Sequence, residues 1–420
     1  MNDKQVFTQL LGLTRPWHIT RVEINSKENR VDVWIEHEKG IRFACPDCGT
    51  LSRIYDHAPE RVLRHLNTCD HQTFLHIRVP RIECPVHGVR LTISDFGEPN
   101  SGMTHSLESR VIDIAMECSV EATARLCGMS WDIGWSVIER AVERGRKRKP
   151  YRLPPRIGID EKAISKGHRY ESLIYDLDGG TVEYVADDRK QNSLESYYRM
   201  FSDEERAGVE TVAIDMWDPY IAATVAYIPG ANKKIVFDRF HVMGYIVDAV
   251  DKVRKQEHKA LHEQGDDTLK GTKYLWLWSH ENIPEYRRDE FERLRSQDLK
   301  VSRAWAIKET LRHLWKYRYE KWMRRFFDQW YWWARHSRLA PIMKAAETLK
   351  THIDNIVTYA RHRITNALGE SINAKIEKVK RMACGFRNKE HYKTAIYFHC
   401  GGLDLYPRPP KKQSLRWATA

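Results

Sequence analysis

Cysteine and long apolar runs are both scarce in this chain of 420 residues. Its eight cysteines are too few for a disulfide scaffold, and only Cys45 and Cys48 form a CxxC pair, a pattern that favours metal binding in a reducing compartment. No apolar stretch approaches the ~20 residues that cross a bilayer. The N-terminus also lacks the charged, apolar and small-residue order of a signal peptide. We therefore expect a cytoplasmic protein with no membrane partner.

Acidic residues are outnumbered, and the excess of base is local. The formal net charge is +12, and residues 140–156 hold eight Lys or Arg against one acid. Residues 375–393 and 407–416 show a similar bias. Such patches suit a polyphosphate, because Lys and Arg release its condensed counterions. A single cluster could equally be a solvated surface or a linker, but several together favour a nucleic-acid partner.

Two short motifs near the N-terminus carry metal-ligand residues. Cys45 and Cys48 are followed, after 35 residues, by Cys84 and His87, and a glycine follows each motif. Cysteine and histidine are the ligands of tetrahedral zinc sites, so we predict a zinc ribbon that opens with a β-hairpin turning at residues 26–29. Two alternatives remain: Cys69 or His71 could replace one ligand, and the thiols could be buried without metal.

Residues 106–148 have helical periodicity and the layout of a helix-turn-helix. The first helix is expected to run to Leu126, the turn to use residues 127–129, and the second helix to span Trp131 to Val142. The second helix would then enter the major groove of DNA, with residues 144–149 on phosphates. The alternative is a helix pair that serves only packing.

The pattern becomes mixed α/β after a proline-rich linker at residues 150–155. Strand, strand, strand, helix, strand, helix, strand is the expected order up to residue 241, with a tight turn at Gly179 and Gly180. This order predicts a ribonuclease-H-like sheet. Residues 246–352 then interrupt the domain with helical sequence holding eight of the fourteen tryptophans. Its aromatic stripe is expected to be mainly core, with a minority of rings exposed to DNA. The stripe consists of Ile307, Leu311, Leu314, Arg318, Trp322, Phe326, Trp330 and Trp333.

Three acids occupy positions typical of a two-metal nuclease site. Asp160 and Asp215 each end an apolar strand-like run, and Glu370 lies in a helical run. Carboxylates are natural Mg²⁺ ligands, and two such cations stabilise both oxygens of phosphodiester displacement. We expect Asp160 to bridge two cations, with Asp215 completing one site and Glu370 the other.

Each acid also has a structural alternative. Asp160 could be a strand-end turn residue, Asp215 a helix cap and Glu370 a solvated helix residue. Helical projection of residues 366–381 places Ile372, Ile376 and Val379 on an apolar face and Asn366, Glu370, Asn373 and Glu377 on the opposite face. Glu161, Asp218 and Asp238 compete for the same roles, and spacing alone does not choose among them.

The motifs GIDE, AIDMWDPY, VFDRFH and TNALGESINAKIEKVKRMACGFRN resemble those of the ISL-three family of bacterial insertion-sequence transposases. The resemblance covers residues 40–403 and implies an Asp-Asp-Glu active site at Asp160, Asp215 and Glu370. It also implies a zinc-binding segment and a helix-turn-helix ahead of the catalytic domain. The chain departs from the family pattern in TNALGES and in CPVH, which affect loop shape and zinc ligation. Asp238 and His241 have two possible roles. They either orient the metal ligands or contact the DNA strand, or they form a hydrogen-bonded pair with a purely structural role.

The sequence thus predicts a DNA transposase that binds terminal inverted repeats, then cleaves and transfers strands. The predicted cofactors are Mg²⁺ (or Mn²⁺) and Zn²⁺, and the partners are double-stranded DNA and a second copy in a homodimer. A DNA-binding repressor with an inert catalytic domain and a structure-selective nuclease or resolvase are the rivals. The predicted parts are a hairpin and zinc ribbon (1–98), a helix-turn-helix with basic linker (99–150), a split catalytic domain (151–245 and 353–403), a helical insertion (246–352) and a basic tail (404–420).

Overall fold

The computed structural model describes the chain except residues 1, 166–168, 189, 365–366, 408–416 and 420. The chain divides into two compact units, each considered by itself. The first comprises Met1–Lys149, Met382–Cys384 and Leu403–Ala420; the second comprises Pro150–Arg381 and Gly385–Gly402. None of the helices in the described part combines the length and apolar character that a bilayer crossing requires.

The first unit opens with helix α1 (Asp3–Leu10) and a four-stranded sheet of order β1-β2-β6-β5. Strands β1 (Trp17–Asn25) and β2 (Arg30–His37) pair antiparallel, which confirms the predicted hairpin. Strands β5 (Arg61–Arg64) and β6 (Gln72–Ile77) complete the sheet. Alternation along β2 buries Val31, Val33 and Ile35 against Phe7, so one face of the sheet forms a core.

A second sheet in this unit has the order β14-β3-β4-β7-β8. Its strands are β3 (Ile41–Ala44), β4 (Leu51–His57), β7 (Pro80–Cys84), β8 (Gly88–Leu91) and β14 (Trp417–Thr419). Strand β7 pairs antiparallel with β4, so the chain returns its second metal-ligand motif to the first. The C-terminal strand β14 pairs with β3 and extends the sheet at that edge.

Three helices complete the first unit: α2 (His105–Glu117), α3 (Val120–Cys127) and α4 (Trp131–Arg148). The turn between α3 and α4 lies where the sequence predicted it, because Gly128 adopts φ +61° and Ser130 caps α4. The predicted end of the second helix at Val142 is wrong, since α4 continues through the basic run to Arg148. The extension has a physical cause: Arg144 is buried in the unit and holds the extra turn in place.

The second unit is built on a five-stranded sheet of order β11-β10-β9-β12-β13. Strand β10 (Arg169–Asp176) pairs antiparallel with β9 (Arg156–Ser165) and β11 (Thr181–Ala186). Strand β12 (Thr211–Ile214) pairs parallel with β9 and with β13 (Ile235–Phe237). The predicted order of strands and helices is confirmed apart from one additional short helix between β11 and β12, and Gly180 supplies φ +66° in the turn before β11.

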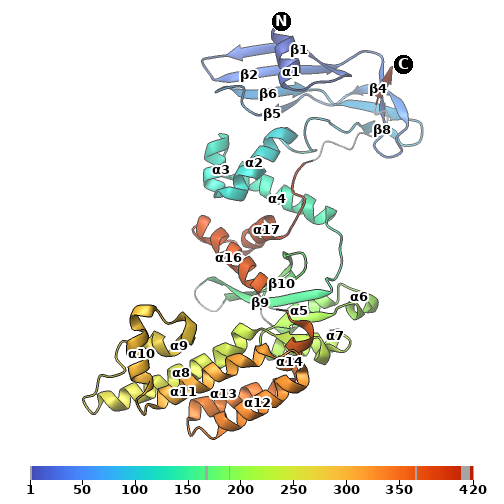
Figure 1. Ribbon diagram of the computed structural model, residues 1–420. Helices are drawn as coiled ribbons and strands as arrows, with labels where there is room; N and C mark the ends of the chain where they lie inside the picture. Colours follow the sequence, from blue (N-terminus) through green and yellow to red (C-terminus); the bar gives the residue numbers. More distant parts are fainter. Residues whose placement is uncertain (1, 166–168, 189, 365–366, 408–416, 420) are drawn as a thin grey trace. The chain divides into compact units, whose positions relative to one another are not determined.

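Helices cover both faces of this sheet (Figure 1). Helices α5 (Gln191–Tyr198) and α7 (Asp218–Tyr227) pack together on one face, near the short helix α6 (Asp203–Ala207), which the sequence did not predict. Helices α16 (Ala367–Met382) and α17 (Lys389–Cys400) lie on the other. Ile372, Ile376 and Val379 are buried, so the predicted apolar face of α16 is confirmed.

A group of helices follows β13, beginning with the long α8 (Arg239–His262). Its other members are α9 (Lys273–Leu277), α10 (Arg288–Arg295), α11 (Lys300–Leu311), α12 (Glu320–Arg335), α13 (Ala340–Thr351), α14 (Ile353–Val357) and α15 (Tyr359–His362). Short 3₁₀ segments are Ala231–Lys233, His280–Asn282, Glu285–Arg287 and Arg312–Lys316.

The stripe of this region is mainly core with an exposed minority, as predicted, since Phe326 and Trp333 also pack against the core. Ile307, Leu311, Leu314 and Trp330 are buried as predicted, but Trp322 is 49% exposed. The continuous spacing of three and four fails because α11 ends at Leu311 and α12 begins at Glu320, which resets the helical phase. The buried face of α12 consists of Met323, Phe327, Trp330 and Ala334.

Candidate active site and zinc site

The two N-terminal motifs bring four ligand atoms together. Donor atoms of Cys45, Cys48, Cys84 and His87 all lie within 4.8 Å of one another. The Sγ atoms of Cys48 and Cys84 are 3.6 Å apart, and His87 Nδ1 lies 3.7 Å from Cys84 Sγ and 3.8 Å from Cys45 Sγ. A tetrahedral ion with Zn–S near 2.3 Å separates its ligands by about 3.8 Å, so these donors fit zinc.

The backbone prepares the ligands for a cation. Gly49 and Gly88 both have positive φ, which lets each motif turn tightly around its last ligand. A hydrogen bond from the backbone N–H of His87 lowers the pKa of the Cys84 thiol to about 6, which favours the metal-binding thiolate. Cys69 and His71 lie outside this group of donors in the part of the chain that the structure describes, so the alternatives for zinc ligation are wrong.

Asp160 and Asp215 lie at the same edge of the second unit's sheet. Gly158 of β9 is in register with Ala213 of β12, and the two strands are parallel. Each aspartate stands two residues beyond that pair, so the two acids lie side by side where the β9–β12 pairing ends. Asp215 follows the end of β12, as predicted, but the predicted strand-end position of Asp160 is wrong, because β9 continues to Ser165 in its pairing with β10. The carboxyl end of a parallel strand is a common position for a binding site.

The electrostatics of Asp215 reflect this proximity. Burial raises the pKa of the Asp215 carboxyl to about 6; the charge of His241 lowers it, and the charges of Asp160 and Glu161 raise it further. The Oδ1 atom of Asp215 is buried and accepts no hydrogen bond from the described residues. A buried carboxylate oxygen without a donor, close to other acids, is suited to a cation.

A hydrogen-bond network joins Asp160 to helix α16. Asn373 Nδ2 donates to Asp160 Oδ2 at 2.7 Å, and Tyr175 OH donates to Asn373 Oδ1 at 3.0 Å. Lys162 Nζ donates to the Asn373 carbonyl at 3.4 Å and pairs with Glu377 at 3.2 Å. These contacts dock α16 on β9 and β10 through the polar face that the sequence predicted.

Sequence reasoning placed Asn373 and Glu377 on that face but assigned them no partner, and it missed Lys162 and Tyr175. One signal was available: residues two apart along a strand share a face, so Lys162 lies on the side of Asp160. The partner residue on β10 depends on register, because Tyr175 faces Gly158 across the antiparallel ladder. Asn366, the fourth member of the predicted face, lies outside the described residues.

Glu370 lies in the first turn of α16 and is exposed. It precedes Asn373 by three residues, so it stands about one helical turn from the side chain that contacts Asp160. Among the described residues, Asp160, Asp215 and Glu370 do not form a group with all ligand atoms within 4.8 Å of one another. The charges of the two aspartates act on each other, whereas the three acids do not form one compact ligand group.

The remaining polar residues near this edge have distinct positions. Asp238 is buried and caps α8, with its side chain accepting from the backbone N–H of Phe240 at 3.3 Å. His241 lies in the first turn of the same helix, where its charge acts on Asp215. Asp218 is the first residue of α7 and is exposed.

Arg144 does not lie on the surface as predicted for a phosphate contact. It is 8% exposed, pairs with Glu98 at 2.8 Å and with Glu108, and donates to the Leu405 carbonyl. Arg148 likewise donates to the Tyr406 carbonyl at 2.7 Å. The role of Arg144 on DNA is therefore corrected: packing within the unit occupies its guanidinium.

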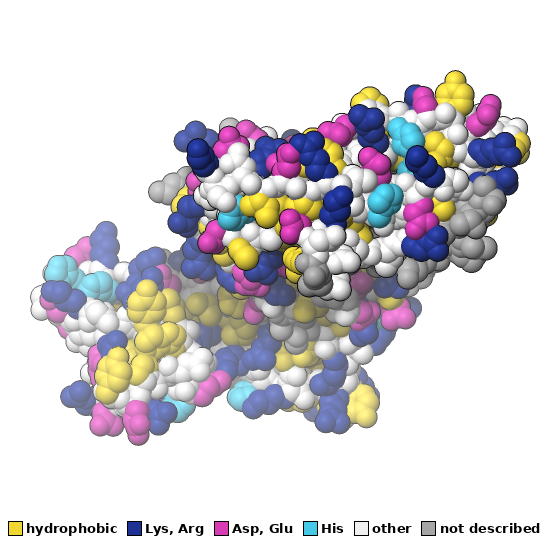
Figure 2. Space-filling view, turned by 90° about the horizontal axis from the view of Figure 1, so that it is seen from above, with side chains coloured by type: hydrophobic (Ala, Val, Ile, Leu, Met, Phe, Trp, Pro, Cys, Tyr) yellow, Lys and Arg dark blue, Asp and Glu magenta, His cyan; other side chains and the backbone are white. Residues whose placement is uncertain are grey.

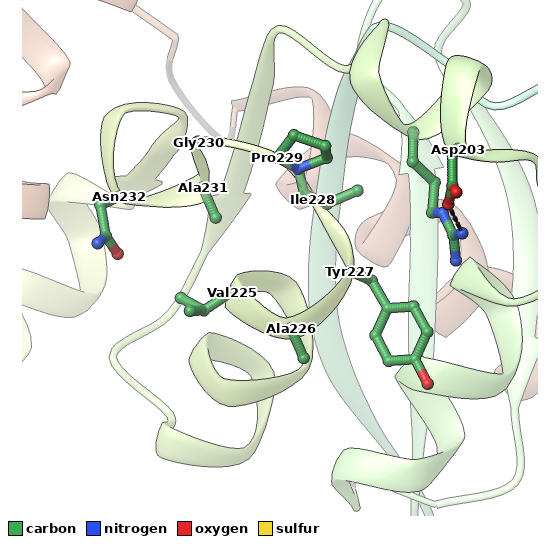
Figure 3. Close-up of a pocket in the computed structure, with 10 residues that line it drawn as sticks. Asp203, Val225, Ala226, Tyr227, Ile228, Pro229, Gly230, Ala231 and Asn232 are labelled. Carbon is green, nitrogen blue, oxygen red and sulfur yellow. Dashed lines mark hydrogen bonds and ion pairs between the residues drawn. The ribbon is translucent and has the colours of Figure 1, made fainter.

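A separate cavity of about 490 Å³ lies between the end of α7 and α6 (Figure 3). Its lining comes mainly from residues 225–232, with Asp203 and Arg206 joined by an ion pair. None of the predicted acids lines it. The cavity has no link to the carboxylate edge, and we assign it no chemistry.

The zinc ribbon and the carboxylate-bearing sheet both match known families. Residues 41–87 match the zinc-finger of transposases IS204, IS1001, IS1096 and IS1165, and residues 157–396 match the transposase domain of the ISL3 type. The chain therefore has the catalytic domain of a DDE transposase, preceded by a zinc ribbon. It belongs to the ISL3 (ISL-three) family, as its sequence motifs predicted.

Full-length relatives are similar along nearly the whole chain. The transposase for insertion sequence element IS1001 of Bordetella parapertussis is 25% identical over 392 residues, covering 91% of this chain and 95% of that protein. The transposase for insertion sequence element IS1557 of Mycobacterium tuberculosis, in strains CDC 1551 and H37Rv, is 25% identical over 420 residues, covering 93% and 94%.

Proposed function

We propose that this transposase binds the terminal inverted repeats of its insertion sequence, cuts a strand at each end and joins the freed 3′-hydroxyl to target DNA. The observation that carries this proposal is the proximity of Asp160, within β9, to Asp215, directly after the adjacent parallel strand β12, with Asn373 of α16 bonded to Asp160. Two acids at one sheet edge, beside the helix that bears a third, suit a metal-dependent phosphodiesterase.

The residues fit a pair of hard divalent cations, Mg²⁺ or Mn²⁺. Asp215 Oδ1 accepts no hydrogen bond from the described residues, and the pKa of Asp215 is raised first by burial and then by the charges of Asp160 and Glu161; a cation would stabilise the ionised carboxylate. Asp160 and Asp215 would hold one ion, and Glu370 would share the second with Asp160. Bound there, the ions supply charge stabilisation to the attacking and leaving oxygens of the phosphodiester.

The chain's own residues then have separate tasks. Asn373 orients Asp160, and Tyr175 fixes the amide of Asn373 with its hydroxyl. The ion pair between Lys162 and Glu377 holds α16 against the sheet. It thereby keeps the helix that carries Glu370 next to the strand that carries Asp160. A modest hinge of the first turn of α16 would bring the exposed Glu370 carboxylate to the aspartates when DNA and metal bind.

The first unit would bind the ends of the element. Helix α4 exposes Trp131, Asp132 and Ile133 in its first turn, next to the Gly128 turn, and this is the part of a recognition helix that reads base edges. On the face of the molecule that Figure 2 shows, Lys and Arg side chains are interleaved with Asp and Glu. Phosphate contacts would therefore come from separate basic side chains and not from one continuous basic patch. Because ion pairs within the unit engage the guanidinium of Arg144, the exposed Lys147 is a better candidate for a phosphate contact than Arg144.

The catalytic domain would be ribonuclease-H-like, since its sheet combines three antiparallel strands with two parallel ones in the order β11-β10-β9-β12-β13. Helices α8 to α13 would form the insertion that splits it, within the parts proposed from the sequence. Because two ends must be cut together, the working unit would be a homodimer.

Strand cleavage of labelled DNA tests this function. The probes are the inverted repeats flanking the gene, a random duplex and a branched duplex, each with Mg²⁺ or with EDTA. We expect Mg²⁺-dependent nicks at the repeats, lost in Asp160→Asn, Asp215→Asn and Glu370→Gln, with end binding retained; Asp218→Asn is the matched control.

Each rival gives a different result in the same assay. Binding to the repeats that ignores Mg²⁺ and yields no nick would support a repressor. Cleavage that follows branches and disregards the repeats would support a structure-selective nuclease. Strand cleavage by a purified variant of any of the three acids would overturn its assigned role.

A further inference from the structure

A basic cavity of about 450 Å³ lies among the helices of the second unit, and the proposed chemistry does not use it. Its wall includes the first residue of α8 and residues of α10, α11, α15 and the 3₁₀ segment Arg312–Lys316. Four permanent cations line it, Arg239, Arg295, Arg312 and Lys316, together with His280 and His313. Glu281 and Glu309 are its acids, so its formal charge is positive.

Internal ion pairs occupy only some of these cations. Arg312 bonds both Glu281 and Glu309, so these two acids are already engaged. Arg295 pairs at 2.8 Å with Glu292. For Arg239 and Lys316, no carboxylate lies within ion-pairing distance among the residues that the structure describes. The cavity therefore presents two cations without a counter-ion.

The guanidinium of Arg239 is held in place without using its donors. It lies over the ring of Trp315, 5.3 Å from the ring centroid, and Trp315 is 6% exposed. A cation–π contact fixes the plane of the guanidinium while its N–H groups stay free to bond an anion. Arginine in this state is suited to two parallel hydrogen bonds to a phosphate.

The cavity adjoins the carboxylate edge along the chain. Arg239 follows Asp238 at the end of β13, the strand beside β12, which leads into Asp215. His241, two residues further on, lies close enough for its charge to act on Asp215. The backbone of Arg239 therefore lies within one helical turn of a residue whose charge acts on Asp215, and its side chain, on a different side of α8, would reach a neighbouring phosphate and not the one that is cut.

We propose that this cavity binds a backbone phosphate of the DNA strand near the bond that is cut, through Arg239 and Lys316. The inference rests on the proposed function and adds a DNA contact in the helical region. The cavity sets the position of the strand by phosphate contact and reads no base, because its cations suit a phosphate and the tryptophans that line it are buried and cannot stack on a base.

The test is the salt dependence of DNA binding, measured by fluorescence anisotropy with zinc-loaded protein and a labelled repeat-end duplex, without added Mg²⁺ and without chelator. Each phosphate contact contributes about 0.9 to the slope of log K against log salt concentration. We expect the slope to fall by about one in Arg239→Ala and by about two in Arg239→Ala/Lys316→Ala. Arg239→Lys should keep most of the slope, because it retains the charge.

Lys252→Ala is the matched control. Lys252 is an exposed cation on the same helix, and no ion pair involves it in the described part of the chain; it lies about 20 Å further along α8. The slope should be that of the unaltered protein. Equal slopes in the double variant and the unaltered protein, with unchanged thermal unfolding, would overturn the proposal. An equal loss in Lys252→Ala would show that any cation of α8 contributes, and would also overturn it.

Two further measurements distinguish a failure of this inference from a failure of the proposed function. Inorganic phosphate titrated into the unaltered protein distinguishes a small-anion site: saturable binding lost in the double variant, with no change in DNA slope, would contradict a strand contact. Mg²⁺-dependent cleavage of the repeats tests the proposed function alone. A smaller salt slope in the double variant, with no cleavage by the unaltered protein, would support the phosphate contact and contradict the proposed reaction. Cleavage of the repeats with an unchanged slope would support the proposed reaction and contradict the phosphate contact.

Discussion

The amide of Asn373 on α16 donates to the carboxylate of Asp160 on β9 across 2.7 Å. An ionised carboxylate only accepts hydrogen bonds, so the Nδ2 atom must face Asp160, and Oδ1 is left to accept from Tyr175. This bond joins the helix that carries Glu370 to the strand that carries Asp160. The catalytic geometry therefore depends on a residue that is not itself an acid.

Asn373→Ala should lower the cleavage rate at least tenfold, because a hydrogen bond to a charged group contributes about 1.5–3 kcal/mol. Tyr175→Phe should have a smaller effect in the same direction, since it only frees the amide. Both variants should raise the Mg²⁺ concentration needed for half-maximal cleavage. Lys378→Ala, on the exposed side of α16, is the control; an unchanged Mg²⁺ requirement in Asn373→Ala would refute the positioning role.

Asp215→Asn should stabilise the Mg²⁺-free protein while abolishing cleavage. The folded-state pKa of about 6 lies above the ordinary value, so this group's contribution to stability is complete near pH 4 and is lost as the pH rises through 6. Removing the charge should raise the free energy of unfolding at pH 7.5 by on the order of 1–2 kcal/mol. Thermal melts of zinc-loaded protein from pH 4 to 8, without added Mg²⁺ and without chelator, measure it as the difference between variant and unaltered protein. A difference that does not grow with pH would contradict the account.

The purified chain should carry one zinc ion, held at Cys45, Cys48, Cys84 and His87. Cys84→Ser should lose the metal and the melting transition of the first unit, because structural zinc contributes directly to folding. Cys69 is exposed and lies outside the ligand group, so the Cys69→Ser variant should retain both the zinc ion and the melting transition. Elemental analysis with thermal melts decides this, and zinc retained in Cys84→Ser would exclude that ligand.

Arg144→Ala should destabilise the first unit by up to about 3–5 kcal/mol, because it removes one of the two arginines that pair with buried Glu108 and leaves Arg140 as its remaining ion-pair partner. Lys147→Ala changes an exposed pair with Glu143 and should alter stability by less than about 1 kcal/mol, while it lowers the salt slope of repeat-end binding. Chemical unfolding and anisotropy together test this division. A stable Arg144→Ala with weakened DNA binding would restore the phosphate role.

Local pattern predicted most of the fold, and long-range contacts account for what it missed. The strand order of the second unit follows from runs of apolar residues, and the zinc ligands from residue type and spacing. Arg144 sits in a run that is otherwise solvated, so only Glu98, Glu108 and Leu405, far along the chain, reveal its burial. The exposure of Trp322 has a related cause, because residue spacing does not reveal the break between α11 and α12.

The site shows the same division. Acid type and apolar runs were sufficient to propose Asp160 and Asp215, although only Asp215 follows a strand end; Tyr175 and Lys162 need the register of β9 against β10. The position of Glu370 relative to the aspartates depends on how α16 docks, which sequence periodicity does not specify. Periodicity gives the face of the helix and leaves its distance to the sheet open.

Mapping with Fe²⁺ in place of Mg²⁺ tests the shared metal site most directly. Iron bound at the site generates hydroxyl radicals that break the chain near its ligands, and the fragments are located by mass spectrometry in zinc-loaded protein bound to repeat-end DNA. The account predicts breaks around Asp160, Asp215 and Glu370 together, suppressed by excess Mg²⁺ and lost in Asp160→Asn. Breaks around the two aspartates with none near Glu370 would contradict a three-carboxylate site.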